Sequence, residues 1–316
     1  MSEGQQVVVL GGTGFIGSAV MRCLARRSDV RAVAVPAPRL RSRARDASAL
    51  LAEAERHADR LDGVVPTGGV LVNASGIAEA SCADADGLVG AHALLPAAAL
   101  LAAVRGGARR FVQISSAAVQ GNLVVLDESE RRLPFSPYSL SKCLGEEVVL
   151  ATDMPIERVV YRPPSVHGVD RAVTRRLASL ARSNLRSVAG DGTRPSPQAL
   201  VDNVAAAVVQ LSLGPRPAPV VIHPWEGLNT GDVLELLGGG RRPRRVPTSL
   251  ARWAVRTAWA IGRGSRLQAA IRRVELLWFG QRQAESWLTG QGWTPPVGRD
   301  GWRSIGDQLS SPSRHM

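Results

Sequence analysis

A tyrosine and a lysine four residues apart are the most informative pair in this sequence. Tyr138 is one of two tyrosines, and Lys142 is the only lysine, because the other 38 of the 39 basic residues are arginines. A position that keeps lysine in such a chain needs a compact ammonium on a flexible stem, which arginine does not supply. Residues i and i+4 share a helix face, so the ammonium can lower the pKa of the phenol from about 10. The pair predicts general acid–base chemistry at Tyr138, and Lys142 could also bind a nicotinamide ribose.

A serine is expected beside this pair. Ser115 and Ser116 follow the expected strand 110–114, and parallel α/β sheets bind ligands at the carboxyl ends of their strands. A hydroxyl there, 22 residues before Tyr138 in the case of Ser116, could hydrogen-bond a carbonyl or carbinol oxygen. Each residue alone is explained by packing, and the combination favours catalysis.

A glycine-rich turn, GGTGFIG at residues 11–17, follows the apolar run Gln6–Leu10 and precedes a helical pattern. Gly11 permits the tight turn, Gly14 lets the backbone approach a pyrophosphate, and Gly17 allows close packing of helix on strand. The helix N-terminus then faces the phosphate charge. This arrangement predicts a dinucleotide site.

The residues after the second expected strand, Val30–Val35, indicate which dinucleotide is bound. NAD sites usually carry Asp or Glu there to hold the ribose 2′-hydroxyl. Here Arg39, Arg41 and Arg43 follow instead. Because arginine pairs with a 2′-phosphate, NADP is favoured over NAD; the alternative is that these arginines belong to a solvated loop.

Strands alternate with helices through the first half of the chain, which predicts an α/β fold with a Rossmann-like doubly wound parallel sheet and a smaller C-terminal substrate-binding domain. We expect residues 1–162 to form the dinucleotide-binding domain, joined by a helix at about 197–213. Residues 163–196 and 214–316 are expected to form the substrate-binding domain. The expected strands are Gln6–Leu10, Val30–Val35, Val70–Asn73, Arg110–Ser115, Ile156–Tyr161 and Val220–Ile222. The expected helices are Phe15–Arg27, Asp46–Arg60, Asp84–Arg105, Ser136–Thr152, Arg171–Ser183, Gln198–Leu213, Thr248–Gly262, Ser265–Phe279 and Trp302–Leu309, and 238–247 is expected to be a loop.

Seven motifs occur in a characteristic order: GGTGFIG at 11–17, NASG at 73–76, FVQISSAAVQG at 111–121, YSLSK at 138–142, YRPPSVHG at 161–168, LVDNVA at 200–205 and GWTP at 292–295. Together they resemble the extended short-chain dehydrogenase/reductase family, of the NAD-dependent epimerase/dehydratase type. The resemblance implies that Ser116 is the catalytic hydroxyl, Tyr138 the acid/base and Lys142 its partner. It also implies that the backbone of Val166 meets the nicotinamide and that Arg194 binds a substrate diphosphate, although a surface arginine explains Arg194 nearly as well.

The expected cofactor-binding residues are Gly11, Gly14, Phe15, Ile16, Gly17, Arg39, Asn73, Ala74, Ser75, Lys142 and Val166, and the expected substrate-binding residues are Ser116 and Arg194. The chain departs from the family at Gln120 and His167, where tyrosines are common. An acidic residue for the adenine has no clear match.

Dehydratases of this family carry Asp-Glu directly after the catalytic hydroxyl, whereas this chain has Ala117 and Ala118. That difference argues against dehydration and leaves hydride transfer. The leading hypothesis is an NADP-dependent reductase of a keto group on a nucleotide-activated deoxysugar. The alternatives are a sugar-nucleotide epimerase with tightly bound NAD and a reductase of a hydrophobic cyclic ketone. A non-enzymatic dinucleotide sensor is the alternative from another class, and the retained Tyr138 and Lys142 favour an enzyme.

The net charge of +12 comes from arginines scattered over several segments, without a stacking-aromatic motif, so we expect anionic small molecules rather than nucleic acid as partners. Three widely spaced cysteines and five unclustered histidines predict neither disulfides nor a metal site.

No stretch approaches a membrane span and no signal peptide is recognised, which predicts a cytoplasmic protein. The helices 248–279 carry Arg and Trp as interfacial membrane helices do, but a half-buried face in the substrate domain is favoured. The family resemblance implies a homodimer formed through helices 84–105 and 136–152.

Overall fold

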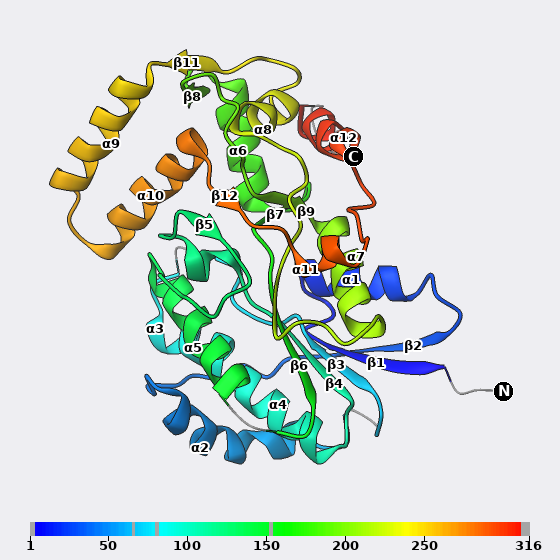
Figure 1. Cartoon of the computed structure of the whole chain (residues 1–316). Helices are drawn as coiled ribbons and strands as arrows, with labels where there is room; N and C mark the ends of the chain where they lie inside the picture. Colours follow the sequence, from blue (N-terminus) through cyan, green and yellow to red (C-terminus); the bar gives the residue numbers. More distant parts are fainter. Residues whose placement is uncertain (1–3, 65–66, 80–81, 152–153, 311–316) are drawn as a thin grey trace, which may run out of the picture.

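The structure, a computed structural model, describes residues 4–64, 67–79, 82–151 and 154–310. Its centre is a six-stranded parallel sheet with the strand order β10-β6-β4-β3-β1-β2 (Figure 1). The strands are β1 (Gln5–Leu10), β2 (Val30–Val35), β3 (Val70–Asn73), β4 (Arg110–Ile114), β6 (Glu157–Arg162) and β10 (Val220–Ile222). The inner strands are buried on both faces and are mostly apolar, and this is why the sequence predicts them; β2, at the edge, is partly exposed but also mostly apolar. The predicted α/β fold with a Rossmann-like parallel sheet is confirmed.

The order of the strands creates a crevice. From β1 the chain passes to β2 on one side, and β3, β4 and β6 then continue on the other side. Connections therefore diverge at the carboxyl ends of β1 and β3, which is where ligands of such sheets bind. The glycine-rich turn follows β1, and residues 74–76 follow β3.

Helices cover both faces of the sheet. One face packs against α1 (Phe15–Leu24) and α7 (Val201–Leu213), and the other against α2 (Ala47–Ala58), α4 (Leu95–Arg105) and α5 (Pro137–Ala151). Figure 1 shows these two layers on either side of the strands. Apolar side chains between the sheet and each layer form two separate clusters, which make up most of the core.

The alanine-rich helix is continuous but contains a π-helical turn. It consists of α3 (Ala85–Val89), the π-turn η2 (Gly90–Leu94) and α4. By length and composition, residues 85–105 could cross a membrane, although the sequence analysis expected no such stretch. Its apolar side chains are almost all buried among α2, α5 and the sheet, so a core position explains them.

The C-terminal part has its own apolar cluster around Trp302. It is built from α6 (Ala172–Arg182), α8 (Thr230–Leu237) and α12 (Arg299–Ser310). The remaining elements are η1 (Asp59–Leu61), η3 (Ala117–Gln120), β5 (Val125–Leu126), β7 (Ser165–His167), β8 (Ser187–Ala189), β9 (Gln198–Leu200), β11 (Arg244–Val246), α9 (Thr248–Ile261), α10 (Ser265–Phe279), β12 (Arg282–Gln283) and α11 (Trp287–Gly290).

Two expectations differ from the structure. Residues 198–200, expected to begin a helix, form β9 and pair with β7, and the expected loop 238–247 contains β11. Both strands are three residues long and owe their conformation to partners distant in the sequence. Strand β10 has the predicted bounds and completes the six-stranded sheet, although it lies within residues 214–316, which were assigned to the substrate-binding domain. The division into two domains stays a prediction.

Candidate active site

The glycine-rich turn has the geometry of a phosphate cradle. Gly11 has φ of +79°, a conformation that favours glycine, and a Cβ there would lie 2.9 Å from the Cα of Ser75. A Cβ on Gly17 would lie 2.2 Å from the carbonyl oxygen of Gly11. Helix α1 begins at Phe15, after Gly14, and has no side-chain cap among the described residues. Its first amides therefore point at the crevice, which fits the pyrophosphate of a dinucleotide.

The segment after β3 forms the opposite wall of the crevice. The side-chain amide of Asn73 donates to Gln113 Oε1 at 2.9 Å, and its Oδ1 accepts from the backbone and hydroxyl of Ser75. The amide of Ala74 donates to the Leu10 carbonyl, which ties this segment to the end of β1. These bonds explain why polar Asn73 is fully buried in an apolar sheet, and they hold Ala74 and Ser75 beside Gly11.

Ser116 and Tyr138 meet at the carboxyl end of β4. Ser116 caps the turn η3, its Oγ accepting from the Ala118 amide at 3.2 Å. Burial raises the pKa of the Tyr138 phenol above its ordinary value, while a hydrogen bond with Ser116 and the positive charge of Arg171 oppose that rise. The spacing of Tyr138 and Lys142 predicts that Lys142 lowers this pKa; in the structure, desolvation is the largest influence on it and Arg171 supplies the opposing charge.

Lys142 lies one turn after Tyr138 on α5 and is buried. Its Nζ donates to the carbonyl of Ile114, the last residue of β4, at 3.1 Å. Burial lowers the pKa of this ammonium to about 8, and the charge of Glu146 opposes the shift. A Cβ on Gly76 would come within 3.6 Å of Nζ, so the ammonium lies between the ends of β3 and β4.

His92, from the π-turn η2, lies beside these residues. Its Nδ1 is 2.8 Å from the Ser141 hydroxyl, and its Nε2 is 3.1 Å from the backbone oxygen of Ile77. Its ring meets the Tyr138 ring edge-on, with the centroids 5.1 Å apart. Burial holds the pKa of His92 well below its usual value, so the imidazole is neutral; it packs against the Tyr138 ring and is itself held by Ser141 and Ile77.

Arg171 approaches the site from the start of α6. Its guanidinium carbon lies 4.9 Å above the centre of the Phe15 ring, and one nitrogen is 3.5 Å from the Ala78 carbonyl. Its Nε is buried and has no hydrogen-bond partner among the described residues. A half-buried cation between the glycine turn and Tyr138 is suited to an anionic ligand group.

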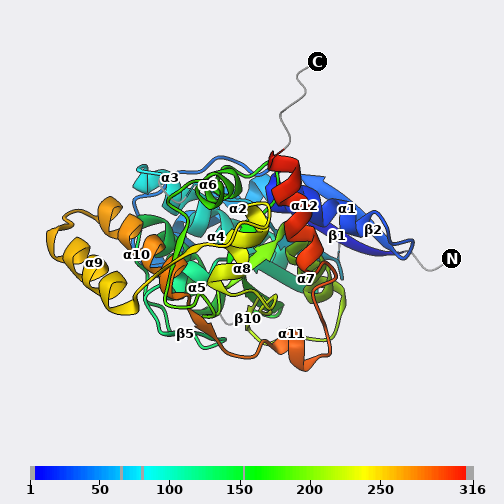
Figure 2. The ribbon, with the colours of Figure 1, turned by 90° about the horizontal axis from the view of Figure 1, so that it is seen from above.

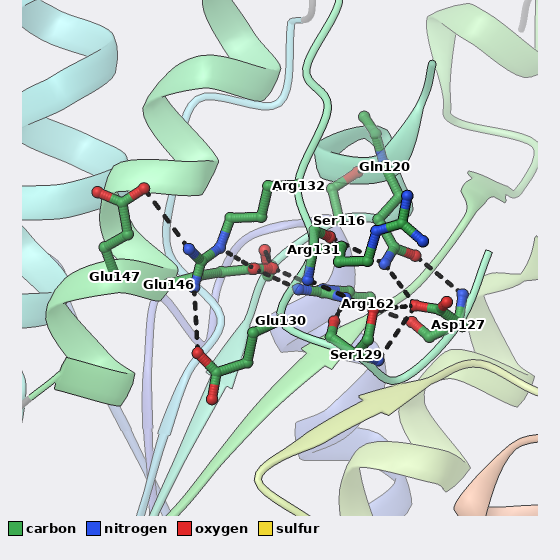
Figure 3. Close-up of polar contacts among 12 residues, drawn as sticks. Ser116, Gln120, Asp127, Ser129, Glu130, Arg131, Arg132, Glu146, Glu147 and Arg162 are labelled. Carbon is green, nitrogen blue, oxygen red and sulfur yellow. Dashed lines mark hydrogen bonds and ion pairs between the residues drawn. The ribbon is translucent and has the colours of Figure 1, made fainter. Parts of the chain in front are cut away.

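A buried ion pair fixes helix α5, which carries Tyr138 and Lys142, to the sheet. Glu146, one turn after Lys142, receives two hydrogen bonds from Arg162 at 3.0 and 2.7 Å and one from Arg132 at 3.1 Å. Ser115 donates to the same carboxylate at 2.6 Å. Figure 3 shows these arginines converging on Glu146 beside the turn that carries Ser116. The carboxylate thereby links α5 to β4 and β6.

The two departures from the family pattern, Gln120 and His167, have structural roles. Gln120 is buried and its amide bonds reciprocally to Asp127, at 2.8 and 2.9 Å, which holds the following loop (Figure 3). His167 is buried between Thr174 and Gln198, and burial lowers its pKa to about 4. Neither side chain is available to a ligand in this arrangement.

The remaining predicted residues lie on three segments. Val166 is buried in β7, which pairs with β9. Arg194 is exposed, on a loop whose next residue, Pro195, accepts from the amide of Gln281. The side chain of Gln281 donates to the carbonyls of Gln120 and Leu123, so the Arg194 loop is tied to the turn that follows Ser116.

The arginines after β2 are not equivalent. Arg41 pairs with Asp84, whereas Arg43 and Arg45 pair with Asp86 at 3.4 and 2.9 Å. These pairs fasten the loop to the start of α3. Arg39 is exposed and has no such ion pair in the described part of the chain, which leaves it as the candidate for a ribose phosphate.

A model of the NAD dependent epimerase/dehydratase family matches residues 7–219, more than half of the chain. The chain belongs to this family. It is therefore an NAD(P)-dependent enzyme of the short-chain dehydrogenase/reductase type, as the motifs predicted. No curated protein matches the sequence significantly.

Solved structures share the fold over nearly the whole chain. The UDP-glucuronic acid 4-epimerase from Bacillus cereus, in complex with NAD, is 18% identical with a TM-score of 0.62, over 96% of each chain. RMD from Pseudomonas aeruginosa, complexed with NADPH, is 19% identical with a TM-score of 0.59, over 97% of this chain and 100% of its own. The human epimerase family protein SDR39U1, with NADPH, is 15% identical with a TM-score of 0.63, over 96% and 99%. The similarity to these three structures establishes the fold.

Sequence reasoning missed Arg171, His92 and Glu146. Arg171 stands three residues after the YRPPSVHG motif, and that position was the available signal. His92 and Glu146 carry no local signal, because their partners come from other segments of the chain. Within the described residues, no group of three or more His, Cys, Asp or Glu is arranged to hold a metal ion.

Proposed function

We propose that this enzyme reduces a keto group of a nucleotide-activated deoxysugar, using Ser116, Tyr138 and Lys142. The observation that carries the proposal is the meeting of Ser116 and Tyr138 at the carboxyl end of β4, with Lys142 one helical turn away. Ala117 and Ala118 stand where an eliminating enzyme of this family has carboxylates, and this favours simple reduction. Related enzymes of known structure bind UDP-glucuronic acid and NAD, which supports a sugar nucleotide as substrate.

The residues around the crevice suit a nicotinamide cofactor. The amides at the start of α1, including those of Phe15 and Ile16, would hold the pyrophosphate, and Lys142 and Val166 would hold the nicotinamide riboside. When bound, the cofactor supplies the hydride donor. Similar structures contain NAD or NADPH, so both are compatible with the fold, and Arg39 supports NADP.

The proton transfer belongs to this chain's own residues. The Tyr138 hydroxyl holds the proton that passes to the substrate oxygen, and the Ser116 hydroxyl hydrogen-bonds that oxygen and orients it. The positive charge of Arg171 favours the phenolate that remains. Arg194 is the candidate for the substrate diphosphate, because it is exposed on a loop tied to the Ser116 turn.

An epimerase that retains NAD is the second candidate, favoured by the similarity to UDP-sugar 4-epimerases. A reductase of a hydrophobic cyclic ketone has less support, since Trp253, one of the aromatic residues that would suit it, is 65% exposed on α9. A homodimer is also proposed from the family resemblance. Leu140 is the large apolar side chain that α5 leaves exposed for it.

The test begins with the nucleotide extracted from freshly purified protein, followed by titration with NADPH and NADH. A reductase should be purified without cofactor, bind NADPH more tightly and oxidise it when a nucleoside-diphosphate 4-keto-6-deoxyhexose is added. Tyr138→Phe should lower that rate by about 10²–10⁴-fold while NADPH affinity is kept. NAD(H) that survives gel filtration would replace the reductase with the epimerase, and a full rate in Tyr138→Phe would refute the catalytic assignment.

A further inference from the structure

Helices α9 and α10 form a hairpin, residues 248–279, which we call the arm. Both views place α9 at the outer edge of the molecule, away from the N-terminus (Figures 1 and 2). Gly264, with φ of +89°, lies in the turn between the two helices. The arm is tied to the rest of the chain at the middle of α10, where Arg272 Nε donates to the Gly121 carbonyl at 2.8 Å. The arm is therefore an ordered projection attached next to the Ser116 turn.

The arm exposes large apolar side chains. The helices have the half-buried face that the sequence predicted, but Trp253 is 65% and Ile261 73% exposed outside it. Of the eleven large apolar side chains that are exposed in the described chain, five lie in these 32 residues. Besides Trp253 and Ile261, these five are Leu250, Leu267 and Val274. Such a concentration on one projecting element marks an interaction surface.

On α9 the exposed apolar residues form a stripe. Leu250, Trp253 and Ile261 are spaced i, i+3 and i+11, which places them along one side of the helix. Ala251 and Val255 of the same helix are buried, so they face inward. The stripe is thus a second apolar side of α9, in addition to the one that packs on the protein.

The charge of the arm is almost entirely positive. It contains six arginines and a single acidic residue, Glu275, which pairs with Arg272 at 2.8 Å. Exposed Arg252 and Arg256 lie one turn apart and form a row next to the apolar stripe of α9. The segment leading into the arm adds exposed Arg241, Arg242, Arg244 and Arg245.

We propose that the arm docks on a membrane surface that contains anionic lipids. In an interfacial helix, aromatic and aliphatic side chains enter the boundary between headgroups and acyl chains, while arginines remain at the anionic headgroups. A nucleic acid would use the arginines but leave Leu250 and Ile261 in water. A second copy docked arm to arm would bring two positively charged surfaces together. The pattern of charge and apolar surface therefore selects an anionic lipid layer.

Sedimentation with vesicles tests the proposal on the full chain. We expect binding to vesicles of phosphatidylcholine mixed with phosphatidylglycerol, much weaker binding to pure phosphatidylcholine, and release as salt is raised. Trp253→Ser combined with Ile261→Ser, and separately Arg252→Glu combined with Arg256→Glu, should each reduce the partition coefficient at least about tenfold. These side chains are exposed, so the variants should fold and bind NADPH as the parent does.

Matched changes elsewhere provide the controls. Trp225→Ser and Arg216→Glu alter an exposed tryptophan and an exposed arginine outside the arm, and neither should change vesicle binding. Absence of binding to the anionic vesicles at low salt would overturn the proposal. An equal loss of vesicle binding in the arm variants and in the control variants would also overturn it. Light scattering gives a further outcome: a mass that halves in Trp253→Ser would make the arm an interface between copies instead.

Discussion

Lys142 carries a charge that its surroundings disfavour. Burial lowers the pKa of its ammonium to about 8, with Glu146 opposing the shift, whereas lysine in an unfolded chain titrates near about 10.4. Between these two values the unfolded chain binds more protons than the folded one, so the free energy of unfolding rises with pH. The buried charge therefore costs stability below the folded pKa, on the order of 3 kcal/mol.

A comparison of the wild type with Lys142→Met isolates this contribution. As pH is raised from about 8 to about 10, the wild type should gain stability relative to the variant, because only the wild type loses the buried charge. Groups that both proteins share cancel in the difference. Urea unfolding at a series of pH values measures it, and a difference that stays constant over this range would contradict the buried, shifted lysine.

A second prediction at the scale of a single residue concerns Arg39 and the preference for NADPH. If its guanidinium holds the ribose phosphate, Arg39→Gln should weaken NADPH binding by roughly tenfold or more and leave NADH binding unchanged. Arg43→Gln removes the same charge from a neighbouring residue that pairs weakly with Asp86, and it serves as the control. Fluorescence titration of both cofactors gives the comparison. If the two substitutions changed the affinity for NADPH equally, Arg39 would not be part of the cofactor site.

The candidate catalytic residues could be proposed from the sequence because they stand in short local motifs. Tyr138 and Lys142 are recognised by their spacing and by the scarcity of lysine in the chain. The three glycines are recognised by their place between a strand and a helix. Arg171 and His92 lie outside these motifs, and their contacts with Phe15 and Ser141 join segments that are distant in the sequence. Only the assembled sheet brings those segments together.

Glu146 shows how two elements depend on one buried carboxylate. It lies on α5, is fully shielded from solvent, and neutralises Arg162 at the end of β6, which is also fully buried. Glu146→Gln would leave the Arg162 charge without its partner in a dry environment, at a cost of about 3–5 kcal/mol. Glu147→Gln, on the exposed side of the same helix, should cost about 0.5 kcal/mol or less.

Chemical denaturation of the two variants tests this difference. We expect a large fall in the unfolding midpoint for Glu146→Gln and almost none for Glu147→Gln. Because the same carboxylate bonds to Ser115, next to Ser116, catalytic rate should fall with stability in the first variant only. Similar midpoints for the two variants would show that the network contributes little to the fold.

Long elements were predictable where local pattern and tertiary environment agree. Strands β1 to β4 and β6 lie in the interior of a parallel sheet or at its edge and read as apolar runs, so the sequence locates each within about a residue or two. Strands β7 and β9 have three residues each and exist only because they pair with one another. Their sequence, which includes buried His167, gives no alternation by which a strand could be recognised.

At the scale of the molecule, the chain leaves the central sheet after β6, returns to it through α7 and β10, and leaves it again to form the rest of the C-terminal part. The carboxylate of one residue joins the sheet to this C-terminal part. Glu226, after β10, accepts hydrogen bonds from Asn203 of α7 at 2.8 Å and from Trp302 of α12 at 3.1 Å, and His223 lies 3.1 Å away. The Leu200 amide donates to the same side chain at 3.1 Å. The apolar clusters of the sheet and of the C-terminal part therefore meet at a buried polar hub.

Glu226→Gln would test whether this hub makes the molecule unfold as one unit. The glutamine amide keeps the shape but turns a donor toward groups that are themselves donors, which should cost about 1–3 kcal/mol per unsatisfied group. The hydrogen bonds that this change breaks join the sheet to α12, so we expect calorimetry to show the single transition broadened or split, with the C-terminal part melting first. Glu285→Gln, at an exposed position, should melt as the wild type does. If the Glu226 variant also melts in one unshifted transition, apolar packing alone holds the two parts together, and the C-terminal part does not depend on the hub for its attachment to the sheet.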